Sequence, residues 1–382
     1  MEPKYIGKRL TYLIIPAFGI IYTLILAKDF LYPLAFGILL SYLLYPIVNY
    51  FEKRGFPRIL SILLTILAAV AVFIAIAIFV LKRFNLFMDE LPRFREMTVD
   101  HIESLQKYLE TSFGIPGERL KNFLIENIFD LGSRSEKIFA ATTGTIFALL
   151  MQPVYVFLFL YYRTKFAYFY LKIVGRENRH IAIVALREIA GVVTRYMLGV
   201  TMVVLILCFF NSAGLMIIGI KYPLLLGVIS ALFSFIPYFG NIIGGMVVLV
   251  FALLTGDSTV LAFHVAIFTF IVHFFENNIL SPNIVGNNIR LNPFVIILGL
   301  IMGAMIWGIP GMLVTIPFLA MFKIVLKTIP SMQAFAFLIG VKGTKKHELT
   351  IKNIKDFIVK IKNRKLAGKE KKKEGNPQNQ TS

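Results

Sequence analysis

The sequence predicts an all-α polytopic membrane protein, and three observations lead to this fold class. Of its 382 residues, 57% are hydrophobic and only 16% are charged, whereas a soluble domain is about half apolar and a quarter charged. Apolar windows of roughly 17–25 residues, the length that crosses a bilayer as a helix, follow one another along most of the chain. Gly/Pro-rich breaks interrupt several of these windows.

About eight hydrophobic spans are expected. They cover approximately residues 10–27, 30–50, 59–81, 138–162, 189–219, 222–255, 258–279 and 293–327. Two of them are Gly/Pro-broken helical hairpins made of short halves, 222–236 with 240–255 and 293–308 with 311–327. Each pair could be two full spans or one re-entrant hairpin. Loop charge does not distinguish these alternatives, because both return the chain to the same side.

The windows divide the chain into four parts. Residues 1–82 form three transmembrane helices, and 83–137 form an extracytoplasmic amphipathic helical segment. Residues 138–330 form a transmembrane core with the broken hairpins, and 331–382 form a cytoplasmic basic amphipathic tail whose end is expected to be disordered. Lys and Arg gather at the N-terminus, at 52–58, at 163–187 and in the tail, which predicts cytoplasmic N- and C-termini. The net charge of +19 therefore indicates contact with membrane lipid and no nucleic-acid partner.

The candidate substrate or ion pathway lies at four breaks, 234–241, 276–282, 286–293 and 307–311. Irregular backbone at lipid depth survives only inside protein or beside a water-filled cavity, and broken helices are typical of transport sites. The residues assigned to this pathway are Pro237, Tyr238, Gly240, Asn241, His273, Glu276, Asn277, Asn278, Ser281, Pro282, Gly286, Arg290 and Pro293.

Glu276 follows an apolar span, one helical turn after His273. A charge at the bilayer centre costs about 2.5–3.5 kcal/mol on insertion scales, and less near the interface. One interpretation is a carboxylate that binds a proton or substrate at a cavity. The other is a boundary carboxylate that is hydrogen-bonded to break amides or paired with Arg290. Both remain open at this point.

Other polar and small residues have weaker interpretations. The side-chain amides of Asn241, Asn277 and Asn278 could hydrogen-bond a polar ligand. They could equally hydrogen-bond the backbone groups that the breaks leave unpaired. Small residues four apart permit close helix packing; they are Gly240, Gly244 and Gly245, and later Gly299 and Gly303. Scattered polar residues within spans are interpreted as snorkelling or interhelical contacts; they are Arg195, Asn211, His264 and Lys323.

Several kinds of chemistry are not expected. Cys208 is the single cysteine, so a thiolate metal cluster is excluded, and the five histidines form no close pair. No Gly-rich phosphate loop of the G-x-x-x-x-G-K-[ST] type occurs. We therefore expect no metal, no cofactor and no enzymatic activity.

The ordered series of motifs at the breaks resembles the autoinducer-2 exporter-like (AI-2E) family. The motifs are Phe235-Ile-Pro-Tyr-Phe-Gly240, Glu276-Asn-Asn-Ile-Leu-Ser-Pro-Asn-Ile-Val-Gly286, Leu291-Asn-Pro293, Trp307-Gly-Ile-Pro-Gly-Met312 and Ile316-Pro317. Asn241 and Asn287 stand where the family often has a proline and a basic residue. The resemblance implies a homo-oligomeric small-molecule exporter of the cell inner membrane, with some relatives linked to sodium/proton exchange.

Three hypotheses follow. The first is an exporter of a small polar metabolite, autoinducer-2-like, that is driven by an ion gradient or passive. The second is a monovalent cation/proton antiporter in which Glu276 binds cation and proton in turn. The third is a non-transporting membrane scaffold that uses the outer helical segment.

Overall fold

A computed structural model describes residues 16, 19–113, 142–237, 239–255, 259–285 and 291–341. Within these residues the secondary structure is helical apart from one isolated antiparallel bridge between Leu291 and Gly340. Five helices are long and apolar enough to cross a membrane, and three shorter helices are also apolar. The prediction of an all-α polytopic membrane protein is confirmed. The later part of the expected outer segment 83–137, from residue 114 on, and the tail from residue 342 lie outside the described residues.

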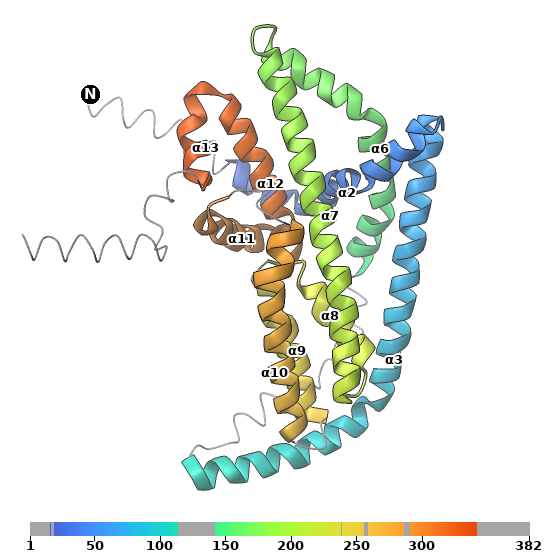
Figure 1. Cartoon of the computed structure of the whole chain (residues 1–382), viewed down its shortest axis with the longest axis vertical. Coiled ribbons are helices and arrows are strands. Elements are labelled where there is room, and N and C mark those ends of the chain that lie inside the picture. Colours follow the sequence, from blue (N-terminus) through green and yellow to red (C-terminus); the bar gives the residue numbers. More distant parts are fainter. Residues whose placement is uncertain are drawn as a thin grey trace, which may run out of the picture.

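Figure 1 shows the arrangement of the helices. In chain order they are α2 (Lys28–Lys53), α3 (Arg58–Phe113), α6 (Thr142–Val174), α7 (Arg179–Ile218), α8 (Pro223–Phe233), α9 (Phe239–Thr255), α10 (Thr259–Phe275), the π-helix η2 (Glu276–Val285), α11 (Pro293–Trp307), α12 (Ile309–Thr328), the 3-10 turn η4 (Pro330–Met332) and α13 (Gln333–Ile339). The long helix α7 runs through the middle of the molecule. It contacts α2 and α12 as well as α8, α10 and η2.

Helix α3 joins two segments that the sequence predicts to be separate. The apolar window 59–81 and the first part of the outer segment form one continuous helix of 56 residues. At 1.5 Å per residue this is about 84 Å, far more than the roughly 30 Å of a bilayer core. Figure 1 shows α3 curving so that its last part crosses the end of the bundle near α9 and α10.

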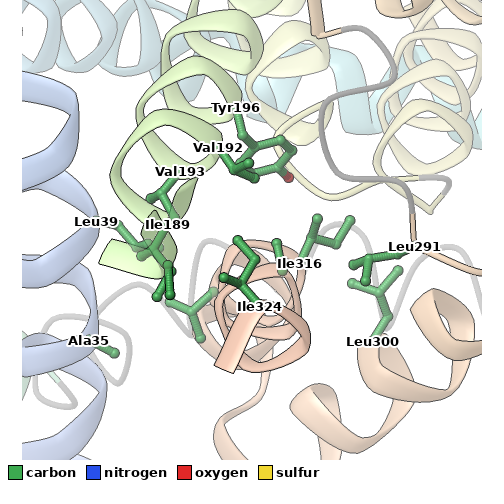
Figure 2. Packing of buried hydrophobic residues seen from close by; sticks show 13 residues of the cluster. Ala35, Leu39, Ile189, Val192, Val193, Tyr196, Leu291, Leu300, Ile316 and Ile324 are labelled. Atoms are coloured by element: carbon green, nitrogen blue, oxygen red, sulfur yellow. The ribbon is translucent and has the colours of Figure 1, made fainter. Parts of the chain in front are cut away.

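The largest buried cluster lies where α7 meets α2 and α12 (Figure 2). Val193 of α7, Leu39 of α2 and Leu300 of α11 have at most 1% of their surface exposed. Leu291, just before α11, belongs to the same cluster. Its neighbour Asn292 donates its backbone N–H to the Ile339 carbonyl at 2.8 Å, which ties the start of α11 to the end of α13.

Polar contacts hold the turn between α2 and α3 against α6. Arg163 of α6 forms an ion pair with Glu52 of α2. Arg58, the first residue of α3, donates Nη2 to the Leu160 carbonyl at 2.9 Å and Nη1 to the Thr164 hydroxyl at 3.2 Å. These contacts fix one end of the bundle with charged groups.

The two expected broken hairpins are present as α8–α9 and α11–α12, and the two helices of each pack against each other. Helix α8 has 11 residues, or about 16 Å, which is about half the thickness of a bilayer core. Glycine is required at both hairpins. A Cβ on Gly240 would lie 1.7 Å from the Phe233 carbonyl oxygen, and one on Gly311 would lie 1.9 Å from the Gly303 oxygen.

Candidate functional site

The break expected at 276–282 is a change of helix type. Helix α10 passes at Glu276 into the ten-residue π-helix η2, with Pro282 inside it, and the two together form the candidate span Val260–Val285. A π-helix bonds each N–H to the carbonyl five residues back, so it winds more loosely than an α-helix. Such segments are rare and frequently occur at functional sites.

Glu276 points into the protein at the start of this π-helix. Its exposed fraction is 4%. The side-chain amide of Asn241 hydrogen-bonds the Glu276 carboxylate, whereas Oε2 has no hydrogen-bond partner among the described residues. Asn241 is itself buried, with 7% of its surface exposed. The first break and the π-helix thus bring together two residues that are 35 positions apart.

Asn241 reaches Glu276 because α9 begins directly after the break. The turn at 234–237 is closed by backbone bonds, among them Ile236 N–H to the Phe233 carbonyl at 2.8 Å. The absent Cβ of Gly240 then lets the first turn of α9 approach the end of α8. The Gly/Pro motif therefore places the amide, and the π-helix places the carboxylate.

A small cavity lies farther along the same helices; His273, one helical turn before Glu276, lines it, whereas Asn241 and Glu276 do not. Its volume is about 10 Å³, which is room for about one water molecule. Its polar lining comes from three helices: Asn211 of α7, Ser230 of α8, and Thr269 and His273 of α10. The Asn211 side-chain amide donates to the Ser230 hydroxyl at 3.4 Å. Two polar partners or more suit an ordered water in such a space.

Glycines bring α9 close to both of its neighbours at this level. A Cβ on Gly244 would lie 2.6 Å from the Ser230 backbone oxygen, and one on Gly245 would lie 2.7 Å from His273 Cε1. The close helix packing predicted at Gly244 and Gly245 is present in the structure. We call Asn211, Ser230, Asn241, His273 and Glu276 the polar cluster.

Other residues assigned to the pathway lie away from the polar cluster. Asn277, Asn278 and Pro282 are exposed on the outer face of η2, and Ser281 is half-buried. The Asn278 side-chain amide donates to the Phe274 carbonyl at 2.8 Å, so it satisfies a backbone group beside the π-helix.

The remaining pathway residues have backbone roles or lie outside the described residues. Pro237 is half-buried in the first break, where its carbonyl accepts from Phe239 N–H at 2.8 Å. Pro293 is the first residue of α11 and is exposed. The described ranges leave out three of the assigned residues, which are Tyr238, Gly286 and Arg290. The alternative pairing of Glu276 with Arg290 therefore stays a prediction.

Sequence reasoning missed part of the site. Ser230 and Thr269 were not singled out, because a lone hydroxyl residue in an apolar window is common and usually bonds its own helix. Of the two contacts expected for Asn211, snorkelling or interhelical, the structure contains the interhelical one, through Ser230, and Asn211 also lines the cavity. Among the described residues, no group of three or more His, Cys, Asp or Glu side chains could hold a metal ion.

The fold and the polar cluster define a class of protein. Several apolar helices cross the membrane, two hairpins are broken, and a carboxylate is buried with amides and hydroxyls inside the helical bundle. Ionisable residues inside a membrane protein mark substrate, ion or proton pathways, and broken helices line such pathways. The molecule is a multi-pass membrane transporter.

Comparison with known proteins gives the family. The model described as "AI-2E family transporter" matches residues 13–331, and the chain belongs to this family. It is similar to "Putative transport protein YrrI" of Bacillus subtilis (strain 168), with 28% identity over 78% of this chain and 86% of the relative.

Two proteins of Escherichia coli (strain K12) are also similar. "Putative transport protein YhhT" is 24% identical over 82% of this chain and 89% of its own length. "AI-2 transport protein TqsA" is 21% identical over 82% of this chain and 90% of its own length.

Proposed function

We propose that this protein exports a small polar metabolite of the autoinducer-2 type, and that protons carried by Glu276 drive the export. The observation that carries the proposal is the burial of Glu276 with one oxygen bonded to Asn241 and the other without a partner among the described residues. The similarity to TqsA, an AI-2 transport protein, supports the substrate class.

The coupling follows from the cost of burying charge. An ionised carboxylate in an apolar interior is strongly disfavoured unless it is paired and hydrogen-bonded. Protonation of Glu276 removes that charge when the helices close around it. When the cluster opens to water the ionised form is solvated and the proton leaves. A carboxyl group that gains a proton in one state and loses it in another couples proton movement to the change of state.

The polar cluster also fits an uncharged substrate. Asn211, Ser230 and Asn241 present amide and hydroxyl groups that donate and accept hydrogen bonds without adding net charge. They lie within otherwise apolar helices, so the substrate would replace bonds that they now make with one another. A polyhydroxylated molecule has the complementary groups. The small cavity marks where the helices separate to admit it.

The same proposal includes orientation and assembly. The turn between α2 and α3 is basic through Lys53, Arg54 and Arg58, and Arg163 of α6 contacts it. The positive-inside rule therefore puts this end in the cytoplasm. The N- and C-termini then lie in the cytoplasm of the inner membrane. The exposed asparagines of η2 lie among exposed Phe274, Phe275 and Ile279, and contact with a second copy of the chain would cover them.

A second candidate is monovalent cation/proton antiport. Its specific support is that a carboxylate oxygen and an amide side chain lie together at Glu276 and Asn241, and oxygen ligands suit hard cations. The third hypothesis, a scaffold that does not transport, gains no support from the polar cluster.

Flux in proteoliposomes tests these alternatives. With an imposed proton gradient, the wild-type protein is expected to move a small polyhydroxylated metabolite, and Glu276→Gln is expected to abolish the gradient-driven flux. Glu188→Gln is the matched control, because Glu188 is an exposed carboxylate that contacts Lys327 at 3.5 Å far from the cluster. Proton-coupled Na⁺ or K⁺ exchange without metabolite flux would establish the antiporter. A Glu276→Gln variant that transports normally would overturn the role of the carboxyl group.

A further inference from the structure

Tyr222 has an unusual backbone conformation. It precedes α8 with φ 57° and ψ 44°, in the left-handed region, and it is the one non-glycine residue with positive φ among those that the structure describes. A bulky side chain rarely adopts this conformation, because its Cβ crowds the backbone. Such a residue persists only where surrounding contacts hold it, and such residues cluster at switches and functional sites.

The contacts that hold Tyr222 come from two other helices. Its hydroxyl donates to the Leu86 carbonyl of α3 at 3.2 Å. Its ring centroid lies 5.8 Å from that of Phe87, edge to face, and 6.5 Å from that of Phe251 of α9. The rings of Phe87 and Phe251 are 5.6 Å apart. We call Phe87, Tyr222 and Phe251 the aromatic clamp.

The clamp fastens the hairpin that carries two of the five residues of the polar cluster. Tyr222 immediately precedes α8, which contains Ser230, and Phe251 lies on α9, which begins near Asn241. The third ring, Phe87, ends the apolar span of α3, which starts at Arg58. At 1.5 Å per residue, 29 residues separate the clamp from the charged α2–α3 turn by about 44 Å. The hairpin is thus fixed to α3 at the end opposite that turn.

We propose that Tyr222 is a positioning residue for transport: through the aromatic clamp it holds the α8–α9 hairpin closed on the polar cluster. Release of Tyr222 from the clamp opens the cluster to the side of the membrane opposite the α2–α3 turn. The proposal rests on the proposed function, because it assigns the moving part of the same site. Aromatic pairs favour the closed state, whereas the left-handed backbone at Tyr222 opposes it. Because the ring contacts stabilise the closed hairpin and the backbone strain at Tyr222 destabilises it, the closed state can be populated and still open.

Substitutions at Tyr222 separate the ring from the backbone. Tyr222→Gly removes the ring and at the same time suits the left-handed backbone, so folding is retained while the clamp is lost. Tyr222→Phe keeps the ring contacts and loses only the bond to Leu86. Phe87→Ala removes the partner ring, and Phe270→Ala, at an exposed site on α10, is its matched control.

Opening is measured by cysteine labelling in a Cys208→Ser background, because Cys208 is the single cysteine. Ser230→Cys reports access to the cluster by a membrane-impermeant maleimide added from either side. Tyr222→Gly and Phe87→Ala are expected to raise the labelling rate from one side about tenfold, within the usual range of coupling between sites. Tyr222→Phe and Phe270→Ala are expected to leave it within about twofold.

A reversible cross-link tests the link to transport. Phe87→Cys with Tyr222→Cys, bridged by a bifunctional methanethiosulfonate, is expected to stop flux, and a reductant is expected to restore it. Full cross-linking with unchanged flux would overturn the proposal, as would unchanged labelling in Tyr222→Gly and Phe87→Ala. Labelling needs no substrate, so a protein that opens as expected but moves neither metabolite nor cation overturns the proposed function and not the clamp.

Discussion

The two broken hairpins, α8–α9 and α11–α12, have the same kind of break and different interiors. Each has one glycine whose Cβ would meet backbone at under 2 Å, Gly240 in the first and Gly311 in the second. The first hairpin buries Ser230 and Asn241 and faces the Glu276 carboxyl group. The second buries aliphatic residues; these are Leu300, Val314, Ile316, Ala320, Ile324 and Leu326.

Even the polar group between α11 and α12 serves packing. Thr315 donates its hydroxyl to the Gly311 carbonyl of its own helix at 2.7 Å, and its side chain fills the space beside Gly299 and Gly303. A Gly/Pro break therefore shows that backbones approach closely. Whether the hairpin is a site or a support depends on polar partners that arrive from other helices.

The first and largest prediction concerns the closely packed glycine of each hairpin. Gly240→Ala and Gly311→Ala should each prevent stable folding or strongly lower the melting temperature, because the added methyl group meets a backbone oxygen at 1.7 and 1.9 Å. The expected cost is about 3 kcal/mol or more, the upper range for overpacking. Thermal unfolding in detergent measures it. Gly191→Ala is the control, since its nearest non-neighbour atom is Arg195 Nη2 at 3.5 Å; equal losses in all three would contradict the close-packing account.

The second prediction separates function from stability at Glu276. Glu276→Gln should abolish proton-driven flux while leaving the melting temperature equal or higher, because the amide cannot release a proton and no longer buries an ionisable group. Flux and thermal unfolding on the same preparation give both values. If Glu276→Gln lost flux only because the protein unfolds, Glu276 would have a structural role, and the first hairpin would no longer differ from the second in function.

The third prediction concerns the bond between the hairpin and the π-helix. Asn241→Leu should lower stability by about 1–3 kcal/mol, because it leaves the buried Glu276 carboxyl group without its amide partner. In a Glu276→Leu background, which has no side-chain acceptor for the Asn241 amide, the same change should cost less, by about 0.5–3 kcal/mol of coupling energy. A double-mutant cycle measures this coupling. Additive effects would mean that the two side chains do not act together.

The smallest effect is expected in the supporting hairpin. Thr315→Val keeps the shape of the side chain and removes the hydroxyl that bonds the Gly311 carbonyl at 2.7 Å and the Gly299 carbonyl of α11 at 3.4 Å. The change should cost about 0.6 kcal/mol, the average for polar contacts in membrane helices. Flux should be unchanged. If Thr315→Val impaired transport as strongly as Asn241→Leu, the α11–α12 hairpin would be part of the pathway as well.

The amino-acid sequence determined the features that depend on local chemistry. Apolar windows predicted a multi-pass helical protein, and the Gly/Pro motifs located both hairpins, because hydropathy and helix breaking are properties of short stretches. Glu276 is recognisable in the sequence by its charge at the end of an apolar span. The continuous α3 was not foreseen, because the change from an apolar to an amphipathic pattern at about residue 82 looked like a boundary.

Only the tertiary structure decided which residues from different helices meet. Its bond with Asn241, the cavity between Asn211, Ser230 and His273, and the aromatic clamp at Tyr222 all join residues from different helices. These contacts depend on how the α8–α9 hairpin folds back between α7 and α10, and on the π-helix that sets the direction of the carboxyl group. Neither the position of the hairpin nor the π-helix can be predicted from the residue spacing of one segment, because each depends on the packing of several helices.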